Sequence, residues 1–334
     1  MAVGADPDPS IVTSSCITDI RTADFVALDL EFSGLFLKPG REPFPLSLED
    51  YFAKCVGSIP EFAPLQLGIC CARQRTEDGT WVLRSHELYL IPNKRRLFTA
   101  DFESLRFLRN HGFDFNAFLD HGHSYSRLPP WGETSKIKVP TGSASAVIAA
   151  LRDAEVPLVV HNGLLDLLHL YDKFVGDLPP VAEDFGTAWR EHFPLLFDTR
   201  LLATEGAKSV LTNHLSGFSL DQLHEGLSGE VQLRFERAGP LPDDGPSHGS
   251  AGHDALLTAE VFLKLMDLWL RSSAALRAKK KRRWTTVGST ATTDVVLEGL
   301  TSADLLSSHE ICGRFWNRVA LVGSSATSLT LGGE

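Results

Sequence analysis

The chain has 334 residues, of which 43% are hydrophobic and 22% are charged, and its formal net charge at pH 7 is −10. This composition is typical of a globular protein with a substantial core, and the acidic balance argues against a protein that coats nucleic acid indiscriminately. The N-terminus lacks the basic start and apolar core of a secretory signal, and no apolar run reaches the roughly 18 to 20 residues of a membrane span, so we expect an intracellular protein with no membrane partner.

The N-terminal part of the chain predicts three strands after a flexible start. Residues 1–14 are predicted to be flexible, and the main domain is predicted to span residues 15–272. A strand pattern at residues 24–31 is followed by apolar runs that begin at Leu65 and Trp81 and are separated by an Asp-Gly turn, which predicts a hairpin. We expect these three strands to form one antiparallel unit.

The middle of the chain alternates helix and strand signals. A helix pattern at residues 102–112 precedes a Pro-, Gly- and Ser-rich loop at residues 122–143. The segment "VPLVVHNGLLDLLHLYDKF" predicts a short strand and then a helix, and "LLFDTRLL" contains another acid-bearing strand end. Residues 228–252 predict a long loop before a helix that starts at His253. This alternation places the domain among the α/β folds, with a mixed sheet flanked by helices.

The composition changes after residue 272. Residues 273–305 are predicted to be a basic and Ser/Thr-rich linker, in which "RAKKKRRW" at residues 277–284 is either a nuclear-import signal or a solvated helix end. Residues 306–334 alternate like strands and are predicted to return to the main domain. The basic run makes the nucleus the expected compartment, with the cytoplasm as the alternative.

The first strand carries an unusual pair of charges. In "FVALDLEFSGL", Asp29 and Glu31 fall on one face, because alternate residues of a strand point the same way. The other face is apolar: Val26, Leu28 and Leu30. Two neighbouring carboxylates repel each other, and a buried pair needs hydrogen bonds, basic partners or a bound cation. The alternative is a polar strand end whose acids lie in water.

Two further acids occupy comparable places. Asp166 and Asp254 lie near a strand end or a helix start, where the active sites of such folds gather. Together with the first pair they supply the roughly four carboxylates that two divalent cations require for phosphodiester hydrolysis. Mg²⁺ prefers such oxygen ligands. A histidine near the last acid would serve as the general base for the attacking water.

Four stretches carry a family resemblance: "DLEFSG", "HGFDFN", "HNGLLDL" and "SHGSAGHDALLTAEVF". In their order and spacing they resemble the DEDDh 3′ exoribonucleases of the PARN-like, poly(A)-specific deadenylase family. The layout is most similar to that of the Cajal-body relatives that trim small nuclear RNAs. The resemblance covers roughly residues 20–270 and, more weakly, about the last 24 residues, and it implies a ribonuclease-H-like fold and two divalent metal ions, Mg²⁺ or Mn²⁺.

The resemblance assigns roles residue by residue. Asp29 and Glu31 match the acids of the first motif, and Asp29 is expected to bridge both metal ions. Asp166 matches the acid of the second motif and is expected to reach the second ion. Asp254 matches the last acid and is expected to join Glu31 on the first ion. Asp198 matches a position outside the metal set, and we expect it to be structural.

The catalytic histidine departs from the family pattern. The pattern places it at the position that Gly249 occupies in this chain. His248 lies one residue further back, and a flexible loop could absorb the shift, because a base need only come within hydrogen-bond reach of the water. His253 would point about 100° away from Asp254 on a helix. We therefore predict His248 as the base, with His253 as the alternative.

Two short segments beside the acids are candidate RNA contacts. Phe32, Ser33 and Gly34 follow the acid pair, where an aromatic ring and a backbone turn could contact the terminal nucleotide. A core role for Phe32 is the alternative. His161 and Asn162 close the next strand and could either hold the turn or contact RNA.

The sequence thus predicts a Mg²⁺-dependent 3′-to-5′ exoribonuclease that removes 3′-terminal nucleotides, adenosines above all, from single-stranded RNA. It would act as a deadenylase or as a trimmer of small RNAs, and the resemblance allows a homodimer or a larger RNA-processing complex. The alternative is a catalytically degenerate nuclease that serves as an RNA-binding or scaffolding subunit. The displaced histidine and the acidic net charge are the reasons for keeping that alternative.

Overall fold

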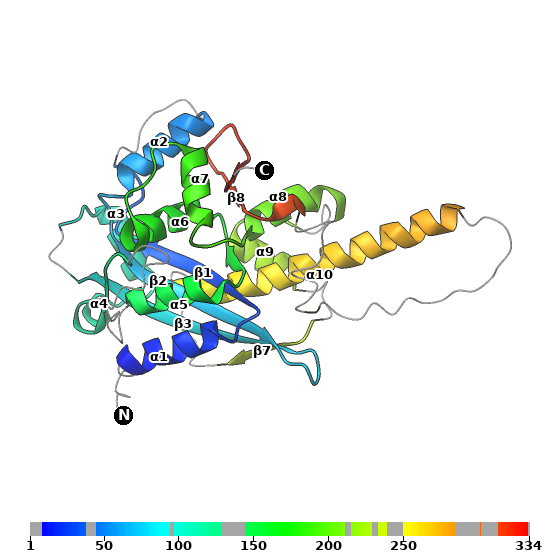
Figure 1. The fold of residues 1–334 in the computed structure, drawn as a ribbon, viewed down its shortest axis with the longest axis horizontal. Coiled ribbons are helices and arrows are strands. Elements are labelled where there is room, and N and C mark those ends of the chain that lie inside the picture. The colour runs from blue at the N-terminus through cyan, green and yellow to red at the C-terminus, as the bar shows by residue number, and fades with distance from the viewer. Residues whose placement is uncertain are drawn as a thin grey trace.

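The computed structural model describes residues 9–37, 45–93, 97–128, 144–210, 215–228, 233–238, 250–284, 301 and 313–332. For residues 9, 206–210 and 273–284 it describes the course of the backbone alone. The chain is built around a central sheet with helices on both faces (Figure 1). Within these stretches no helix combines the length and the apolar character that crossing a bilayer requires.

The central sheet has seven strands of mixed direction. They are β1 (Phe25–Phe32), β2 (Pro64–Gln74), β3 (Trp81–Pro92), β4 (His123–Tyr125), β5 (Leu158–Val160), β6 (Leu196–Asp198) and β7 (Phe235–Ala238). The order is β4-β3-β2-β1-β5-β6, and β7 pairs with β3. β1, β2 and β3 are antiparallel neighbours, as predicted, whereas β5 and β6 continue the sheet parallel to β1. The predicted mixed α/β fold is confirmed.

Helices cover both faces of the sheet. One face packs against α1 (Pro9–Ile20), α2 (Leu48–Ser58), α5 (Ala144–Ala154), α6 (Leu164–Leu170), the π-helical turn η1 (Tyr171–Val175) and α7 (Ala182–Arg190). The other face packs against α8 (Thr199–Val210), α9 (Leu220–Gly226) and the long α10 (Ala251–Trp284). A small third cluster joins α3 (Phe102–Asn110) and α4 (Phe115–His121) to the edge of the sheet.

β1 lies inside the sheet, and its alternate side chains pack into two separate hydrophobic clusters, one on each face. Val26, Leu28 and Leu30 belong to the apolar cluster beneath the first group of helices. Phe25 and Ala27 point the other way, into the cluster formed with α10. A strand with both faces buried is apolar at almost every position, which explains the sequence of β1 up to its two acids.

α10 lies close against the sheet and is fixed near its start and further along its length. Near the start, a Cβ atom at Gly68 in β2 would lie 1.7 Å from the carbonyl oxygen of Ala251, so only glycine permits this approach. Further along, Glu260 pairs with His224 Nε2 of α9 and accepts a hydrogen bond from Arg237 Nε of β7, each at 2.7 Å. Burial alone would raise the pKa of Glu260, but these partners outweigh it and lower the pKa to about 2.

The N-terminal part of the structure differs from the prediction. α1 begins at Pro9, so residues 9–14 are helical and not flexible. Its Ser, Thr and Ile residues are weak helix formers, which is why the local sequence gives little signal. The helix is stabilised instead by tertiary packing, because Cys16 and Ile20 are fully buried in the core. α2 was not predicted either.

Two further differences concern β7 and α10. β7 lies inside the predicted loop at residues 228–252, because the edge of β3 offers it unpaired backbone groups: the Trp81 N–H donates to the Arg234 carbonyl at 2.9 Å. α10 continues through residue 284, so residues 273–284 of the predicted linker are helical. Residues 285–300 and 302–305 of that linker lie outside the described residues.

The described C-terminal residues form a small sheet of their own. β8 (Arg318–Ala320) and β9 (Ser328–Thr330) pair with each other and not with the central sheet. They dock on β6, because the Asn317 N–H donates to the Leu196 carbonyl at 2.9 Å and the Leu196 N–H donates to Asn317 Oδ1 at 3.1 Å. The end of the chain therefore contacts the domain through β6.

Gly68→Ala is expected to lower the free energy of unfolding by about 1–3 kcal/mol, because the added methyl group would overlap the backbone of α10. Urea unfolding measures the change. Gly57→Ala is the matched control, since nothing lies within 4 Å of a Cβ atom at that position in α2. Alanine is the better helix former, so the control should be neutral or stabilising. A Gly68→Ala protein as stable as wild type would contradict the close approach of helix and sheet.

Candidate active site

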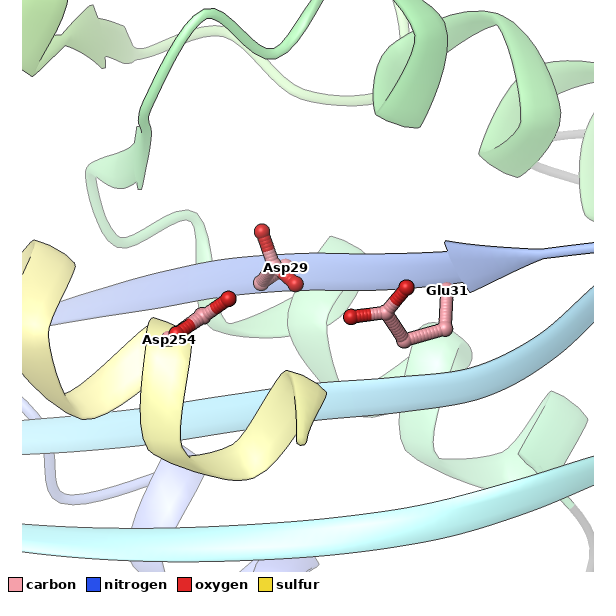
Figure 2. A group of neighbouring side chains, drawn as sticks. All are labelled: Asp29, Glu31 and Asp254. Carbon is pink, nitrogen blue, oxygen red and sulfur yellow. The ribbon is translucent and has the colours of Figure 1, made fainter. Parts of the chain in front are cut away.

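Three carboxylates from two elements converge at the end of β1 (Figure 2). Asp29 and Glu31 project from β1, and Asp254 projects toward them from the first turn of α10. Each offers one carboxylate oxygen, and these oxygens lie within 4.8 Å of one another. Hard oxygen donors at this spacing fit a divalent cation such as Mg²⁺ or Mn²⁺.

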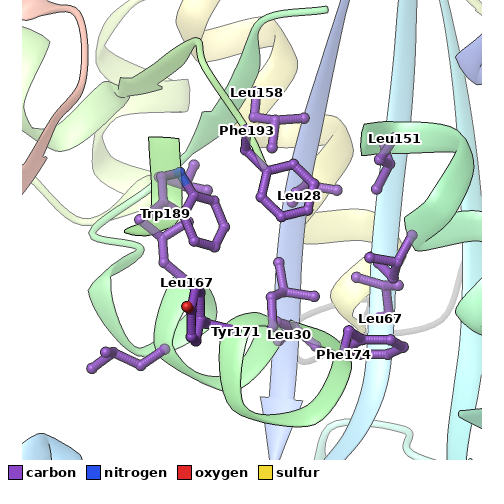
Figure 3. Close-up of a cluster of buried hydrophobic side chains, with 14 of the residues drawn as sticks. Leu28, Leu30, Leu67, Leu151, Leu158, Leu167, Tyr171, Phe174, Trp189 and Phe193 are labelled. Carbon is purple, nitrogen blue, oxygen red and sulfur yellow. The ribbon is translucent and has the colours of Figure 1, made fainter. Parts of the chain in front are cut away.

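The pleat of β1 puts the acids on this face. Leu28 and Leu30, which alternate with them, point into the apolar cluster on the opposite side, where they lie among Leu67, Phe174 and other large side chains (Figure 3). Turning the strand over would bury the two acids in that cluster. The shared face of Asp29 and Glu31 that the sequence predicts is therefore enforced by the hydrophobic core.

Asp166 comes from a third element. It lies in the first turn of α6, directly after β5, and its side chain is buried. Because β5 is parallel to β1, the carboxyl ends of both strands lie at the same edge of the sheet. Asp166 is not among the three converging oxygens, but its charge raises the pKa of both Asp29 and Glu31. The four predicted acids are thus neighbours.

Asp29, Glu31 and Asp166 each hold a proton more tightly than usual. Burial first, and then the charges of the other three acids, raise the pKa of Asp29 well above its usual range. Burial and the charges of Asp254 and Asp166 raise the pKa of Glu31 to about 8. Burial also raises the pKa of Asp166 to about 8, although backbone N–H groups stabilise its charged form. A cation in this place would restore the charged forms at neutral pH.

The turn before Asp166 is fixed by the buried carboxylate of Asp198. Backbone N–H groups donate to it from five residues: Asn162 (3.1 Å), Gly163 (3.2 Å), Arg200 (2.9 Å), Leu201 (3.3 Å) and Ala320 (3.0 Å). One side chain therefore joins the end of β5, the start of α8 and the C-terminal β8. These contacts support the structural role predicted for Asp198.

Of the two candidate bases, the structure describes one. His248 lies outside the described residues, as does Gly249. His253 is half-buried in the first turn of α10, next to Asp254, and its backbone N–H donates to Ser250 Oγ at 3.5 Å. The assignment of the base to His248 or His253 remains a prediction.

His161 and Asn162 shape the turn between β5 and α6. His161 Nδ1 lies 2.8 Å from Thr199 Oγ1. Burial and the charge of Arg200 lower the pKa of His161 to about 4, so this ring is neutral at pH 7. Asn162 adopts a left-handed φ of 55° and is held there by the bond from its N–H to Asp198. These contacts favour the turn-holding role, and RNA contact by either residue stays a prediction.

The three predicted RNA contacts after the acid pair are packed against the protein: Phe32, Ser33 and Gly34. The ring of Phe32 stacks on buried His169 at a centroid distance of 4.3 Å. The Ser33 hydroxyl donates to the Thr99 carbonyl at 2.7 Å and accepts from the Ala63 N–H at 3.0 Å. A Cβ atom at Gly34 would lie 2.3 Å from the ring of Phe62. These contacts fix the end of β1 and favour the core role.

Two side chains beside the start of α10 were not among the predicted site residues. Gln66 of β2 accepts a hydrogen bond from the backbone N–H of Ala251, and Glu87 of β3 accepts one from the backbone N–H of Gly252. A signal for Glu87 was available, because it is a carboxylate inside an otherwise half-apolar strand, as Asp29 is in β1. Nothing in the sequence showed that a distant helix would begin beside it.

Several known ribonucleases are similar to this chain. A family model described as CAF1 family ribonuclease matches residues 11–138 and 132–262. Poly(A)-specific ribonuclease PNLDC1 of Mus musculus is 24% identical over 374 residues, covering 75% of this chain and 68% of that protein. The pre-piRNA 3′-exonuclease trimmer of Bombyx mori is 21% identical over 364 residues, covering 74% and 68%.

A solved structure shares the fold. The Mg²⁺- and Mn²⁺-bound form of S. pombe Pop2p superposes with a TM-score of 0.51 at 19% sequence identity. The superposition covers 77% of this chain and 89% of that chain. At this level of identity the likeness concerns the arrangement of the sheet and helices.

Removing one carboxylate is expected to stabilise the metal-free protein and to abolish its response to metal. At pH 7, Asp29→Asn should raise the free energy of unfolding in EDTA by about 1–3 kcal/mol, because burial and the neighbouring acids disfavour the charged form of Asp29 in the folded protein and the amide carries no charge. Mn²⁺ should raise the melting temperature of the wild type but not that of the variant. Urea unfolding in EDTA and thermal unfolding with MnCl₂ measure the two effects. An Asp29→Asn protein less stable than wild type in EDTA would argue against strong repulsion at the site.

Proposed function

The chain belongs to the CAF1 family of ribonucleases, and we propose that it is a metal-dependent 3′-to-5′ exoribonuclease that shortens single-stranded RNA from its 3′ end. The observation that carries this proposal is the convergence of Asp29, Glu31 and Asp254, whose carboxylate oxygens lie within 4.8 Å of one another. The Bombyx mori relative, a 3′-exonuclease, supports the direction of attack, and the mouse relative, a poly(A)-specific ribonuclease, supports RNA as the substrate.

Adenosine-rich 3′ ends are the substrate we propose first. The mouse relative is poly(A)-specific, whereas the Bombyx mori relative acts on pre-piRNA, so the 3′ end of a small RNA is the second candidate. The clustered acids act on the phosphodiester and do not distinguish these ends. The homodimer or larger complex, and the nuclear location suggested by residues 277–284, remain predictions.

Two divalent cations, Mg²⁺ or Mn²⁺, would be held by four acids of the chain: Asp29, Glu31, Asp166 and Asp254. When bound, such ions activate a water and stabilise the charge that develops on the phosphate. The protein contributes by fixing the carboxylates on β1, α6 and α10, so that the repulsion among them favours the bound state. The ions bound to S. pombe Pop2p support this choice of metal.

The first experiment is a time course on 5′-labelled RNA with a 3′ adenosine tail. Mg²⁺ or Mn²⁺ should produce a ladder that shortens from the 3′ end, and EDTA or Asp29→Ala should abolish it, because the acids then hold no cation. A matched RNA with a 3′ uridine tail measures the base preference. Internal fragments in place of a ladder would argue for an endonuclease.

Two outcomes would contradict this function. RNA that is retained by the protein but never shortened, with either ion, would favour the RNA-binding or scaffolding subunit. Shortening by Asp29→Ala at the wild-type rate would remove the acid cluster from the reaction. Equal rates on adenosine and uridine tails would contradict the proposed preference for adenosine while leaving the exonuclease in place.

His248→Ala is expected to lower the rate by about 10²–10⁴-fold, the range typical for loss of a general base, with metal binding preserved. His253→Ala, assayed beside it, serves as the comparison, and the same RNA ladder measures both rates. A larger loss in His253→Ala would reverse the assignment of the base. Wild-type rates in both variants would show that neither histidine activates the water.

A further inference from the structure

The first turn of α10, which carries Asp254, is capped by side chains of the sheet. A helix leaves its first four backbone N–H groups without partners inside the helix. Here the Ala251 N–H donates to Gln66 Oε1 of β2 at 3.0 Å, and the Gly252 N–H donates to Glu87 Oε2 of β3 at 3.3 Å. Side chains on two strands thus define where the helix begins.

Glu87 holds this turn through more than one contact. The same oxygen that accepts from Gly252 also accepts a short hydrogen bond from the Ser250 hydroxyl. On the same strand, Ser85 Oγ donates to the Gly252 carbonyl at 2.5 Å. A carboxylate beside the N-terminus of a helix also interacts favourably with the helix dipole. Glu87 is therefore both a hydrogen-bond acceptor and a favourable charge for the start of α10.

The register of the sheet places Glu87 opposite the acid pair. Asp29 pairs with Gly68 across β1 and β2, and Gly68 pairs with Glu87 across β2 and β3. Paired residues share a face of the sheet, so the two carboxylates flank a position that has no side chain. The backbone at Ala251 occupies that space, since a Cβ atom at Gly68 would lie 1.7 Å from its carbonyl oxygen. The backbone at the start of α10 therefore lies between Asp29 and Glu87 on this face of the sheet.

We propose that Glu87 is a positioning residue for the metal site: it fixes the first turn of α10 and thereby keeps Asp254 within reach of Asp29 and Glu31. The inference rests on the proposed function, because it concerns the metal that the three acids would hold. Asp254 lies in the same helical turn as Gly252, so a displacement of that turn moves its carboxylate. Partners that orient metal ligands typically contribute 10–100-fold to metal affinity.

The test measures Mn²⁺ binding directly by isothermal titration calorimetry, on the full chain without RNA. Glu87→Ala should raise the Kd for Mn²⁺ by about 10–100-fold. Glu87→Gln should keep the Kd within about threefold of wild type, because its amide oxygen still accepts both hydrogen bonds. If Glu87→Ala does not fold, Ser250→Ala removes one of the two contacts of Glu87, the hydrogen bond from the Ser250 hydroxyl, and should raise the Kd by a smaller factor.

Glu260→Gln is the matched control. It also alters a buried carboxylate that holds α10, but its partners are His224 and Arg237, further along the helix. It should lower the melting temperature and leave the Kd for Mn²⁺ unchanged. If Glu260→Gln raises the Kd as much as Glu87→Ala does, the effect comes from a general loosening of α10, and the positioning role is overturned.

The remaining outcomes separate the inference from the function on which it rests. Equal losses of Mn²⁺ affinity in Glu87→Ala and Glu87→Gln would assign the effect to the charge of Glu87 and overturn the positioning role. Wild-type affinity in Glu87→Ala, or in Ser250→Ala where that variant is used, would overturn it as well. Asp29→Ala is expected to bind no Mn²⁺. If the wild-type protein also binds none, the proposed metal site itself is overturned, and the inference with it.

Discussion

Repulsion among carboxylates is the constraint on which the arrangement of this protein depends. Four acids lie close together and are partly shielded from water: burial and the charges of Asp254 and Asp166 raise the pKa of Glu31 to about 8, and burial raises that of Asp166 to about 8. The acids are distributed over β1, α6 and α10, and each of these elements is anchored by contacts of its own.

The anchors differ in kind, and together they explain the layering of the fold. β1 is held by apolar clusters on both faces, so its acids cannot rotate away. α6 follows a turn that the carboxylate of Asp198 fixes through backbone N–H groups. The start of α10 is capped by Gln66 and Glu87 on the sheet. Hydrophobic burial supplies the free energy, and directional hydrogen bonds determine where the acids end up.

The parts of the site that the sequence predicted are those that local patterns control. The strand period placed Asp29 and Glu31 on one face, and the strand-to-helix turn placed Asp166 at the edge of the sheet. The parts that were missed depend on approaches between distant segments. The capping role of Glu87 exists only because α10 lies against β2, and α1 is helical because its buried side chains pack on the core. Such contacts leave no periodic signal in the chain.

The Asp198 carboxylate accepts one of its hydrogen bonds from Ala320, in a part of the chain that lies beyond the matched ribonuclease region, which ends at residue 262. A chain cut after residue 262 would keep every acid of the site and the whole region that the family model matches. It would nevertheless leave Asp198 short of a partner and the end of β6 uncovered. The part of the chain that these hydrogen bonds join is therefore larger than the region that the family model matches.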